Sequence, residues 1–78
     1  MSEPAMELDC RGQLCPMPVL ALARAITEIE VGAAIAVLAT DPAAAVDIAA
    51  WCRMKGQEYL GADVADDGTP RYGVRRLS

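Results

Sequence analysis

The 78-residue sequence contains no histidine, and this absence excludes several kinds of active site. A cysteine–histidine nucleophile pair cannot form, because its general base is missing. The three cysteines are scattered with no CxxC pair, so a thioredoxin-like dithiol is excluded and a zinc site is not expected. No glycine-rich loop follows a strand in a phosphate-binding pattern. The sequence therefore predicts no metal site and no bound cofactor.

Long apolar runs and an excess of basic residues are missing too. The apolar stretches end before the ~20 residues that a membrane helix needs, and the acidic start does not resemble a signal peptide. We therefore expect a cytoplasmic protein with reduced thiols, since three cysteines fit no disulfide framework. The net charge of −4 argues against direct nucleic-acid binding. Arg71, Arg75 and Arg76 form a local basic patch, which we interpret as part of a solvated edge strand in preference to a nucleic-acid-binding surface.

The sequence does contain enough apolar residues to form one small folded domain. Hydrophobic residues make up 54% of the chain, so it should fold rather than stay disordered. Much of this fraction is alanine and phenylalanine is absent, which predicts a closely packed core of small side chains. Because chains this short rarely divide, we treat residues 1–78 as a single domain, with about 6–78 ordered.

Four segments have the pattern of β-strands. Met6, Leu8 and Cys10 alternate with acids, as in a half-buried strand, and a later apolar run is typical of a central strand. Acidic residues and a glycine between the last two segments predict a hairpin turn. The predicted strands cover residues 6–10, 33–39, 58–65 and 71–77.

Two segments have the pattern of α-helices. The first carries one apolar stripe at helical spacing, formed by Val19, Leu22, Ala23, Ile26 and Ile29. We expect it to end at Gly32. Thr40-Asp41-Pro42 is a start signal for a second helix, which should run to about Met54 and be closed by Gly56. The order βαβαββ predicts an α+β domain with two helices on one face of a four-stranded sheet.

The segment Cys15-Pro16-Met17-Pro18 stands at the start of the first helix. Prolines are tolerated there, because the first N–H groups of a helix have no helical partner. The residue before a proline avoids helical geometry, so we predict that Cys15 is the N-cap. A thiolate at that position faces the positive end of the helix dipole, which predicts a lowered pKa for Cys15. The Met17 N–H is the expected donor to the sulfur.

Such a thiolate would be nucleophilic, and the same setting would stabilise a persulfide anion, Cys–S–S⁻. The alternative is a small buried cysteine that only caps a helix. The flanking prolines favour the first interpretation, because they place the sulfur at a helix mouth that the sheet end leaves open. We therefore predict that Cys15 carries a reactive sulfur atom between partner enzymes.

The other two cysteines have the pattern of core residues. Cys10 shares the inward face of its strand with Met6 and Leu8, and Cys52 falls in the most apolar quarter of the second helix. A disulfide between Cys10 and Cys15 is the minority alternative.

On a helical wheel of the second helix, Asp47, Trp51 and Met54 lie opposite that apolar quarter. An aromatic residue and a methionine beside an acid, facing away from the core, indicate a docking surface for a partner protein. A tryptophan tucked into the edge of the core is an equally good interpretation.

These motifs together resemble the TusA/SirA family of sulfur-carrier proteins over nearly the whole chain. The most specific element is the cysteine-proline-any-proline segment in its βαβαββ context. The matching segments are Leu8-Asp9-Cys10-Arg11-Gly12, Leu14-Cys15-Pro16-Met17-Pro18-Val19, Ala39-Thr40-Asp41-Pro42-Ala43, Asp47-Ile48, Trp51-Cys52 and the strand around Arg75.

The resemblance implies a two-layer α/β sandwich with a mixed sheet, in which Cys15 accepts persulfide sulfur and hands it on. The covalent persulfide is then the only cofactor, and Pro16, Met17, Pro18 and Asp41 shape the site. The family's donors are cysteine desulfurases or rhodanese-like proteins. Its acceptors serve tRNA 2-thiolation, molybdenum-cofactor maturation or sulfur oxidation.

The resemblance also bears on the partner surface. Arg24 is the one basic residue of the first helix, where tRNA-thiolation members carry several that meet the desulfurase. A carrier that presents one thiol to several partners is most simply a monomer. The competing hypothesis is a regulatory or binding module whose partner contacts the Trp51 surface, with Cys15 as a redox sensor or a mere cap.

Overall fold

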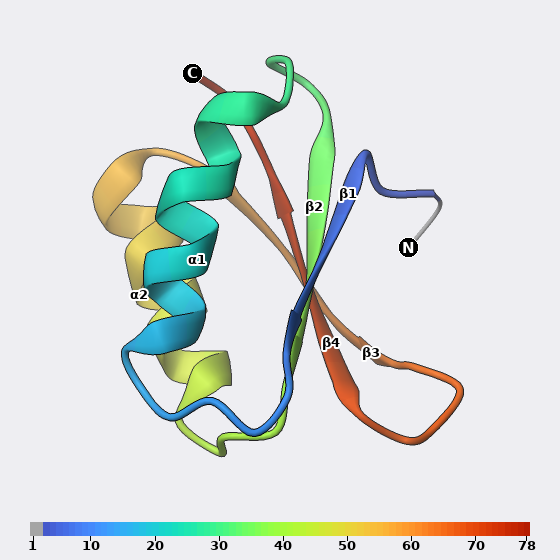
Figure 1. Cartoon of the computed structure of the whole chain (residues 1–78). Helices are drawn as coiled ribbons and strands as arrows, with labels where there is room; N and C mark the ends of the chain where they lie inside the picture. The colour runs from blue at the N-terminus through green and yellow to red at the C-terminus, as the bar shows by residue number, and fades with distance from the viewer. Residues whose placement is uncertain (1–2) are drawn as a thin grey trace.

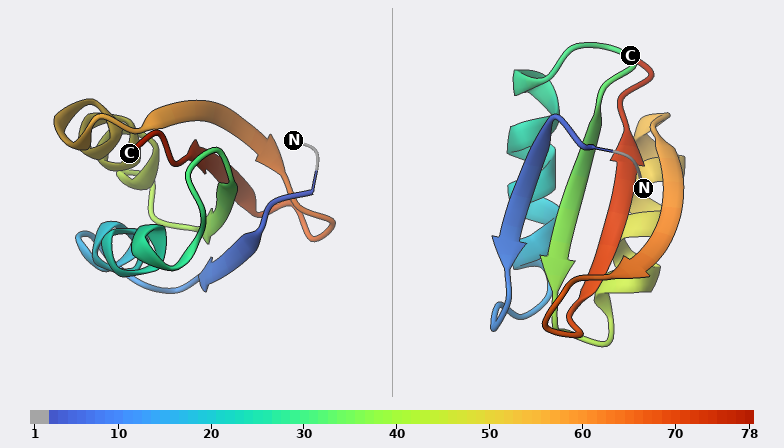
Figure 2. Two further views of the ribbon diagram at one scale, coloured as in Figure 1. Left: turned by 90° about the horizontal axis from the view of Figure 1, so that it is seen from above. Right: turned by 90° about the vertical axis from the view of Figure 1, so that its right-hand side faces the viewer.

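The computed structural model describes residues 3–78, in which two helices cover one face of a single four-stranded sheet (Figure 1). A view onto the open face of the sheet shows the strand order β1-β2-β4-β3, with the helices behind (Figure 2). The elements are β1 (Met6–Cys10), α1 (Met17–Ala25), a 3-10 turn η1 (Ile26–Glu28), β2 (Ala34–Ala39), α2 (Ala44–Lys55), β3 (Glu58–Val64) and β4 (Pro70–Arg75).

The sheet is mixed, which confirms the predicted α+β sandwich. β1 runs parallel to β2 with Leu8 opposite Val37, and β4 pairs antiparallel with both β2 and β3. The parallel pair requires a helical crossover, which α1 supplies. Because β1 and β2 run in the same direction, the loops that follow them emerge at the same edge of the sheet, at the bottom of Figure 1. Each of these loops leads into a helix.

The core lies between the sheet and the helices. Its fully buried side chains come from both layers: Leu22 and Ile48 from the helices, and Ile35, Val37 and Val74 from the strands. Burying a side chain of this size contributes about 1.5–3 kcal/mol. No helix within residues 3–78 is both long enough and apolar enough to cross a membrane.

The first helix ends earlier than its apolar stripe predicts. α1 stops at Ala25, a 3-10 turn follows, and Ile29 is already extended at φ −108° and ψ 159°. Ile26 and Ile29 are nevertheless buried, so the stripe marks residues that reach the core rather than the length of the helix. Gly32 does not end the helix; it lies in the turn before β2, where its φ of 94° suits glycine.

The second helix starts later than predicted. Its N-cap is Ala43, because Asp41 and Pro42 form a turn before the helix rather than its first positions. Asp41 still supports this turn, since its Oδ1 accepts a hydrogen bond from the Ala43 N–H at 2.9 Å. At the other end α2 continues to Lys55, and Gly56 closes it in the left-handed conformation at φ 72°, as the sequence predicts.

β4 is an interior strand, so its interpretation as a solvated edge strand is wrong. Its arginines pair with acids of the neighbouring strand. Arg71 makes two hydrogen bonds to Asp63, at 2.9 and 2.8 Å, and Arg75 contacts Glu58 at 3.2 Å. The side chains of Arg71 and Arg75 are therefore paired with acids across neighbouring strands.

Candidate functional site

Two loops meet at the edge of the sheet where β1 and β2 end. The Gly12 N–H donates to Thr40 Oγ1 at 3.0 Å, and the Cys15 N–H donates to Asp41 Oδ2 at 2.7 Å. The Asp41 carboxylate thereby holds the backbone of both loops, through Cys15 with one oxygen and through Ala43 with the other. These N–H groups lower the pKa of Asp41, the Ala43 N–H contributing most. Asp41 thus links the two loops, and its role in shaping the site stays a prediction.

The turn between β3 and β4 is bound to the loop after β1 through Arg11. Its guanidinium contacts Asp9 at 2.8 Å and reaches Asp67, in the β3–β4 turn, at 2.7 Å. The hydrogen bond from Arg11 lowers the pKa of Asp9 to about 2. Bonds from Thr69, and then from Arg11, lower the pKa of Asp67 to about 2. The loop that carries Cys15 is therefore tied to distant parts of the chain on two sides.

The Cys15-Pro16-Met17-Pro18 segment does not use Cys15 as the N-cap. Pro16 is the N-cap, at φ −101° and ψ 20°, and the peptide bond between Cys15 and Pro16 is cis. The helix therefore begins one residue later than predicted, with Pro18 at its second position. The Met17 N–H donates to the Leu14 carbonyl at 2.8 Å, so it is not the predicted donor to the sulfur.

The Cys15 side chain is exposed, and its thiol donates to Asp47 Oδ2 at 2.6 Å. This hydrogen bond is the largest of the effects that raise the pKa of Cys15, followed by desolvation and by the charges of Asp47 and Asp41. The predicted lowering by the helix dipole is wrong. A full carboxylate charge in contact with the sulfur outweighs the roughly half charge at the start of a helix, and Cys15 lies outside the helix.

Cys15 lines a groove between α1 and α2. The groove has a volume of about 300 Å³ and is lined by Cys15, Pro16, Val19, Asp47, Ala50, Trp51 and Met54. Apart from Asp47 and the thiol, these side chains are apolar. The arrangement places an exposed thiol beside a mostly apolar surface.

Trp51 belongs to the core, so it does not form an exposed docking surface. Only 6% of its surface is accessible, against 74% for Met54 three residues later. The helical wheel placed both residues on the face turned away from the sheet. In the structure the buried stripe of α2 consists of Ala44, Ile48, Trp51 and Cys52, so Trp51 faces the core and Met54 stays exposed. The alternative interpretation of a tucked-in tryptophan is the correct one.

Arg24, the remaining residue predicted for the partner surface, is exposed on the last turn of α1 and does not line the groove. Sequence reasoning did not predict the exposure of three apolar side chains near Cys15 in the chain, although it named Met17 as shaping the site. Leu14 is 73% exposed, Met17 49% and Leu20 46%. The exposure of Leu20 could have been predicted, because this residue falls outside the apolar stripe of the first helix.

Comparison with known proteins identifies the fold and its relatives. Residues 6–76 match the family described as "Sulfurtransferase TusA". The chain belongs to the TusA family. The sulfur carrier protein TusA of Pseudomonas syringae pv. syringae is 38% identical over 84 residues, which cover 100% of this chain and 99% of the relative. The sulfur carrier protein TusA of Pseudomonas entomophila is 38% identical over 69 residues, covering 88% and 85% of the two chains.

A solved structure also resembles this TusA-family fold. The SirA-like protein of Desulfitobacterium hafniense superposes with a TM-score of 0.73 at 25% identity. The match covers 94% of this chain and 99% of that protein.

The other two cysteines are core residues, as predicted. Cys10 is 2% exposed and Cys52 1%, and all three cysteines are free thiols. Burial raises the pKa of Cys10, and it raises that of Cys52 to about 11. The minority alternative, a disulfide between Cys10 and Cys15, is not formed. Among the residues that the structure describes, Cys15 is therefore the one thiol that this TusA-family member presents to solvent.

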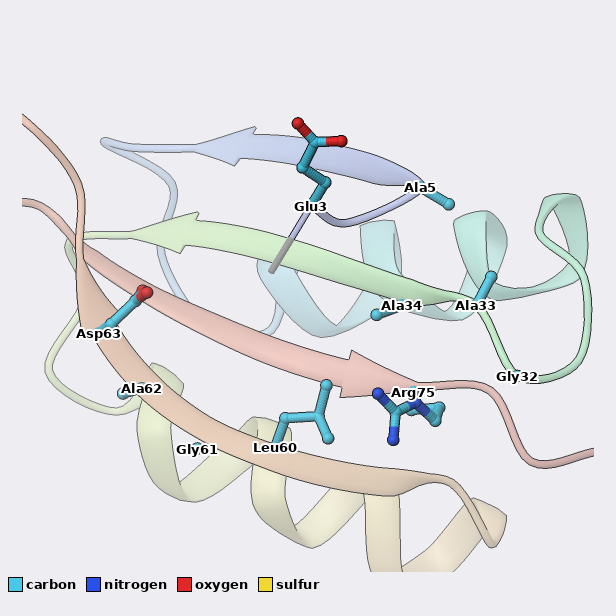
Figure 3. Close-up of a pocket in the computed structure, with 10 residues that line it drawn as sticks. All are labelled: Glu3, Ala5, Gly32, Ala33, Ala34, Leu60, Gly61, Ala62, Asp63 and Arg75. Carbon is cyan, nitrogen blue, oxygen red and sulfur yellow. The ribbon is translucent and has the colours of Figure 1, made fainter. Parts of the chain in front are cut away.

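A larger hollow lies on the open face of the sheet and contains none of the motif residues. Its volume is about 500 Å³, and Figure 3 shows Leu60 and Arg75 beside it on β3 and β4, with Glu3 across from them. Within residues 3–78, no cysteine lines this hollow.

Proposed function

We propose that this protein is a sulfur carrier that accepts a sulfur atom as a persulfide on Cys15 and passes it to an acceptor protein. The observation that carries the proposal is the exposed Cys15 thiol, which lines an apolar groove and lies on a loop held by Asp41. The names of the two Pseudomonas relatives support it, since both are sulfur carrier proteins.

The transfer is an exchange between a thiol and a persulfide. The Cys15 sulfur attacks the outer sulfur of a donor persulfide, R–S–SH, and a new S–S bond forms on Cys15. The S–S bond of the donor breaks and the donor leaves as its thiol, R–SH. The reaction has no net oxidation or reduction, so it requires no cofactor besides the persulfide itself.

The donor is a cysteine desulfurase or a rhodanese-like protein. The acceptor belongs to tRNA 2-thiolation, molybdenum-cofactor maturation or sulfur oxidation. Partner binding covers the groove and the exposed apolar side chains around it, Leu14, Met17, Leu20 and Met54. Arg24 extends this contact along α1. The carrier acts as a monomer in the cytoplasm, without touching nucleic acid.

The competing hypothesis, a binding module centred on Trp51, has lost its main support. A side chain that is 6% exposed offers little surface to a partner. The remaining exposed residue of that face, Met54, lies in the same groove as Cys15 and serves the carrier function equally well.

Intact-protein mass spectrometry tests the proposal. The protein is incubated with a cysteine desulfurase and cysteine, and in parallel with a rhodanese and polysulfide. We expect one added sulfur atom in the wild type, mapping to Cys15, and none in Cys15→Ser. Cys10→Ala, which alters a buried thiol, serves as the matched control and should still be loaded. No addition to the wild type from either donor, or undiminished addition to Cys15→Ser, would contradict the carrier function.

A further inference from the structure

The two carboxylates beside Cys15 make different contacts. Asp41 uses both of its oxygens for backbone N–H groups, those of Cys15 and Ala43. Asp47 instead contacts the sulfur, accepting the thiol hydrogen bond on Oδ2 at 2.6 Å from a position 32 residues later in the chain. Asp41 therefore holds the loop, whereas Asp47 touches the atom that reacts.

The surroundings of Asp47 strengthen this contact. Within residues 3–78, its carboxylate forms no ion pair with a lysine or arginine and no other hydrogen bond. The adjacent groove wall is apolar, formed by Val19, Ala50 and Trp51. A partner that covers this wall excludes water and strengthens the interaction between Asp47 and Cys15.

This arrangement disfavours loss of the Cys15 proton, so a nearby base is needed to accept it. Asp47 and Asp41 are the ionisable groups that act on Cys15, and both are negative, so the resting sulfur is held as a thiol. The thiolate is the form that attacks a persulfide. A thiol of high pKa is a strong nucleophile once it is deprotonated, but a poor leaving group when the sulfur is passed on. Taking up the sulfur and passing it on therefore both require a group that accepts and returns the thiol proton.

We propose that Asp47 is a catalytic residue of sulfur transfer, which takes the Cys15 proton as sulfur arrives and returns it as sulfur leaves. This inference rests on the proposed carrier function. During loading, the proton moves from Cys15 Sγ to Asp47 Oδ2 while the sulfur attacks the outer sulfur of R–S–SH. The donor S–S bond breaks, and the released R–S⁻ takes the proton from Asp47. The products are Cys15–S–SH and R–SH, with the Asp47 carboxylate regenerated.

Unloading uses the same carboxylate in reverse. An acceptor thiol, R′–SH, gives its proton to Asp47 and attacks the outer sulfur of the Cys15 persulfide. The S–S bond on Cys15 breaks, and the leaving sulfur takes the proton back from Asp47 as R′–S–SH forms. Proton return offsets the poor leaving ability of a thiolate with a raised pKa. A single residue thus serves both directions of the transfer.

The test compares two reactions of the same sulfur in Asp47→Asn. One is alkylation by iodoacetamide at neutral pH, which reports the thiolate fraction. The other is single-turnover loading from glutathione persulfide, followed by intact-protein mass spectrometry. We expect alkylation to become several-fold faster, because a neutral amide removes the charge that disfavours the thiolate. We expect loading to become slower by at least about tenfold, because the base is lost.

The controls separate catalysis from a structural effect. Asp47→Glu keeps a carboxylate and should recover part of the loading rate, and Glu30→Gln, in the exposed turn before β2, should change neither reaction. Loading by Asp47→Asn should depend more steeply on pH than loading by the wild type, because the variant relies on free thiolate. Thermal unfolding by circular dichroism verifies that each variant is folded.

The outcomes that overturn the inference are distinct from those that overturn the carrier function. If alkylation and loading both become faster in Asp47→Asn, Asp47 only restrains the thiol and is not a base. If neither rate changes, the hydrogen bond has no part in the chemistry. If the wild type itself takes up no sulfur, the carrier function fails, and the role of Asp47 fails with it.

Discussion

The Cys15 N–H donates to Asp41 Oδ2 at 2.7 Å, across 26 residues of sequence. This bond joins the loop after β1 to the loop after β2, and it directs the Cys15 side chain toward α2 and Asp47. The position of the sulfur therefore depends on Asp41, which binds the Cys15 backbone rather than the sulfur.

Replacing Asp41 tests this dependence. In Asp41→Ala both backbone N–H groups lose their acceptor, so we expect a lower melting temperature and several-fold slower loading of Cys15 from a persulfide donor. Asp41→Asn keeps one acceptor oxygen and should lie between the wild type and the alanine variant. Melting curves and single-turnover loading measure the two effects. Unchanged loading in Asp41→Ala would show that Cys15 is positioned without this bond.

Trp51→Ala should lower the stability of the fold, rather than act on partner binding alone. The side chain is buried against the core, and truncating a buried tryptophan costs about 3–5 kcal/mol. Chemical denaturation monitored by far-UV circular dichroism measures this loss. Trp51→Phe retains most of the packing and should restore most of the stability. A fully stable alanine variant that no longer binds its partner would instead support the docking-surface hypothesis.

Met54 and Val46 offer a matched pair for mapping the partner surface. Both lie on α2 with similar exposure, 74% and 71%, but only Met54 lines the groove beside Cys15. We expect Met54→Ser to weaken sulfur transfer from a protein donor by raising the donor concentration required for half-maximal rate. Val46→Ser should leave that concentration unchanged. Equal effects of the two substitutions would place the partner contact outside the groove.

Low pH should destabilise the protein by weakening the ion pairs that hold the loop carrying Cys15. The pKa values of Asp9 and Asp67 fall from 3.8 to about 2 in the folded protein. A carboxyl group with a lowered folded pKa stabilises the fold above its unfolded value, and this contribution is lost as pH falls through the folded value. Melting temperature should therefore decrease between about pH 4 and pH 2.

Arg11→Gln provides the control for this acid dependence. The substitution removes the guanidinium that contacts both Asp9 and Asp67. The variant should melt at a lower temperature at neutral pH and lose less stability between about pH 4 and pH 2, because its carboxyl groups titrate closer to their unfolded values. Identical pH profiles for wild type and variant would assign the acid sensitivity to other groups.

Most of the fold could be predicted from local patterns. The alternation in β1, the apolar run of β2 and the glycine that closes α2 are each visible within a few residues, and all three occur in the structure. The end of α1 was placed too late, because Ile26 and Ile29 keep the helical spacing although their backbone does not. Periodicity reports which residues reach the core, and an extended residue can do so as well as a helical one.

The errors at the site have a different origin. The wheel of the second helix takes Cys52, Ala45, Ile48 and Ala49 as the inward face, whereas the buried stripe in the structure runs through Ala44, Ile48, Trp51 and Cys52. The pKa of Cys15 was assigned from the adjacent helix start, and the group that decides it, Asp47, is 32 residues away in the chain. A short-range dipole argument fails when a long-range contact places a full charge on the sulfur.

By itself the sequence determined the strand and helix order, the buried positions of Cys10 and Cys52, and the proline-flanked segment that singles out Cys15. These follow from local spacing and from the fixed geometry of proline. Only the tertiary structure decided that Cys15 contacts Asp47 and that α1 and α2 form a groove beside the sulfur. The reason is that both depend on how two separate βα units pack side by side, which no local pattern encodes.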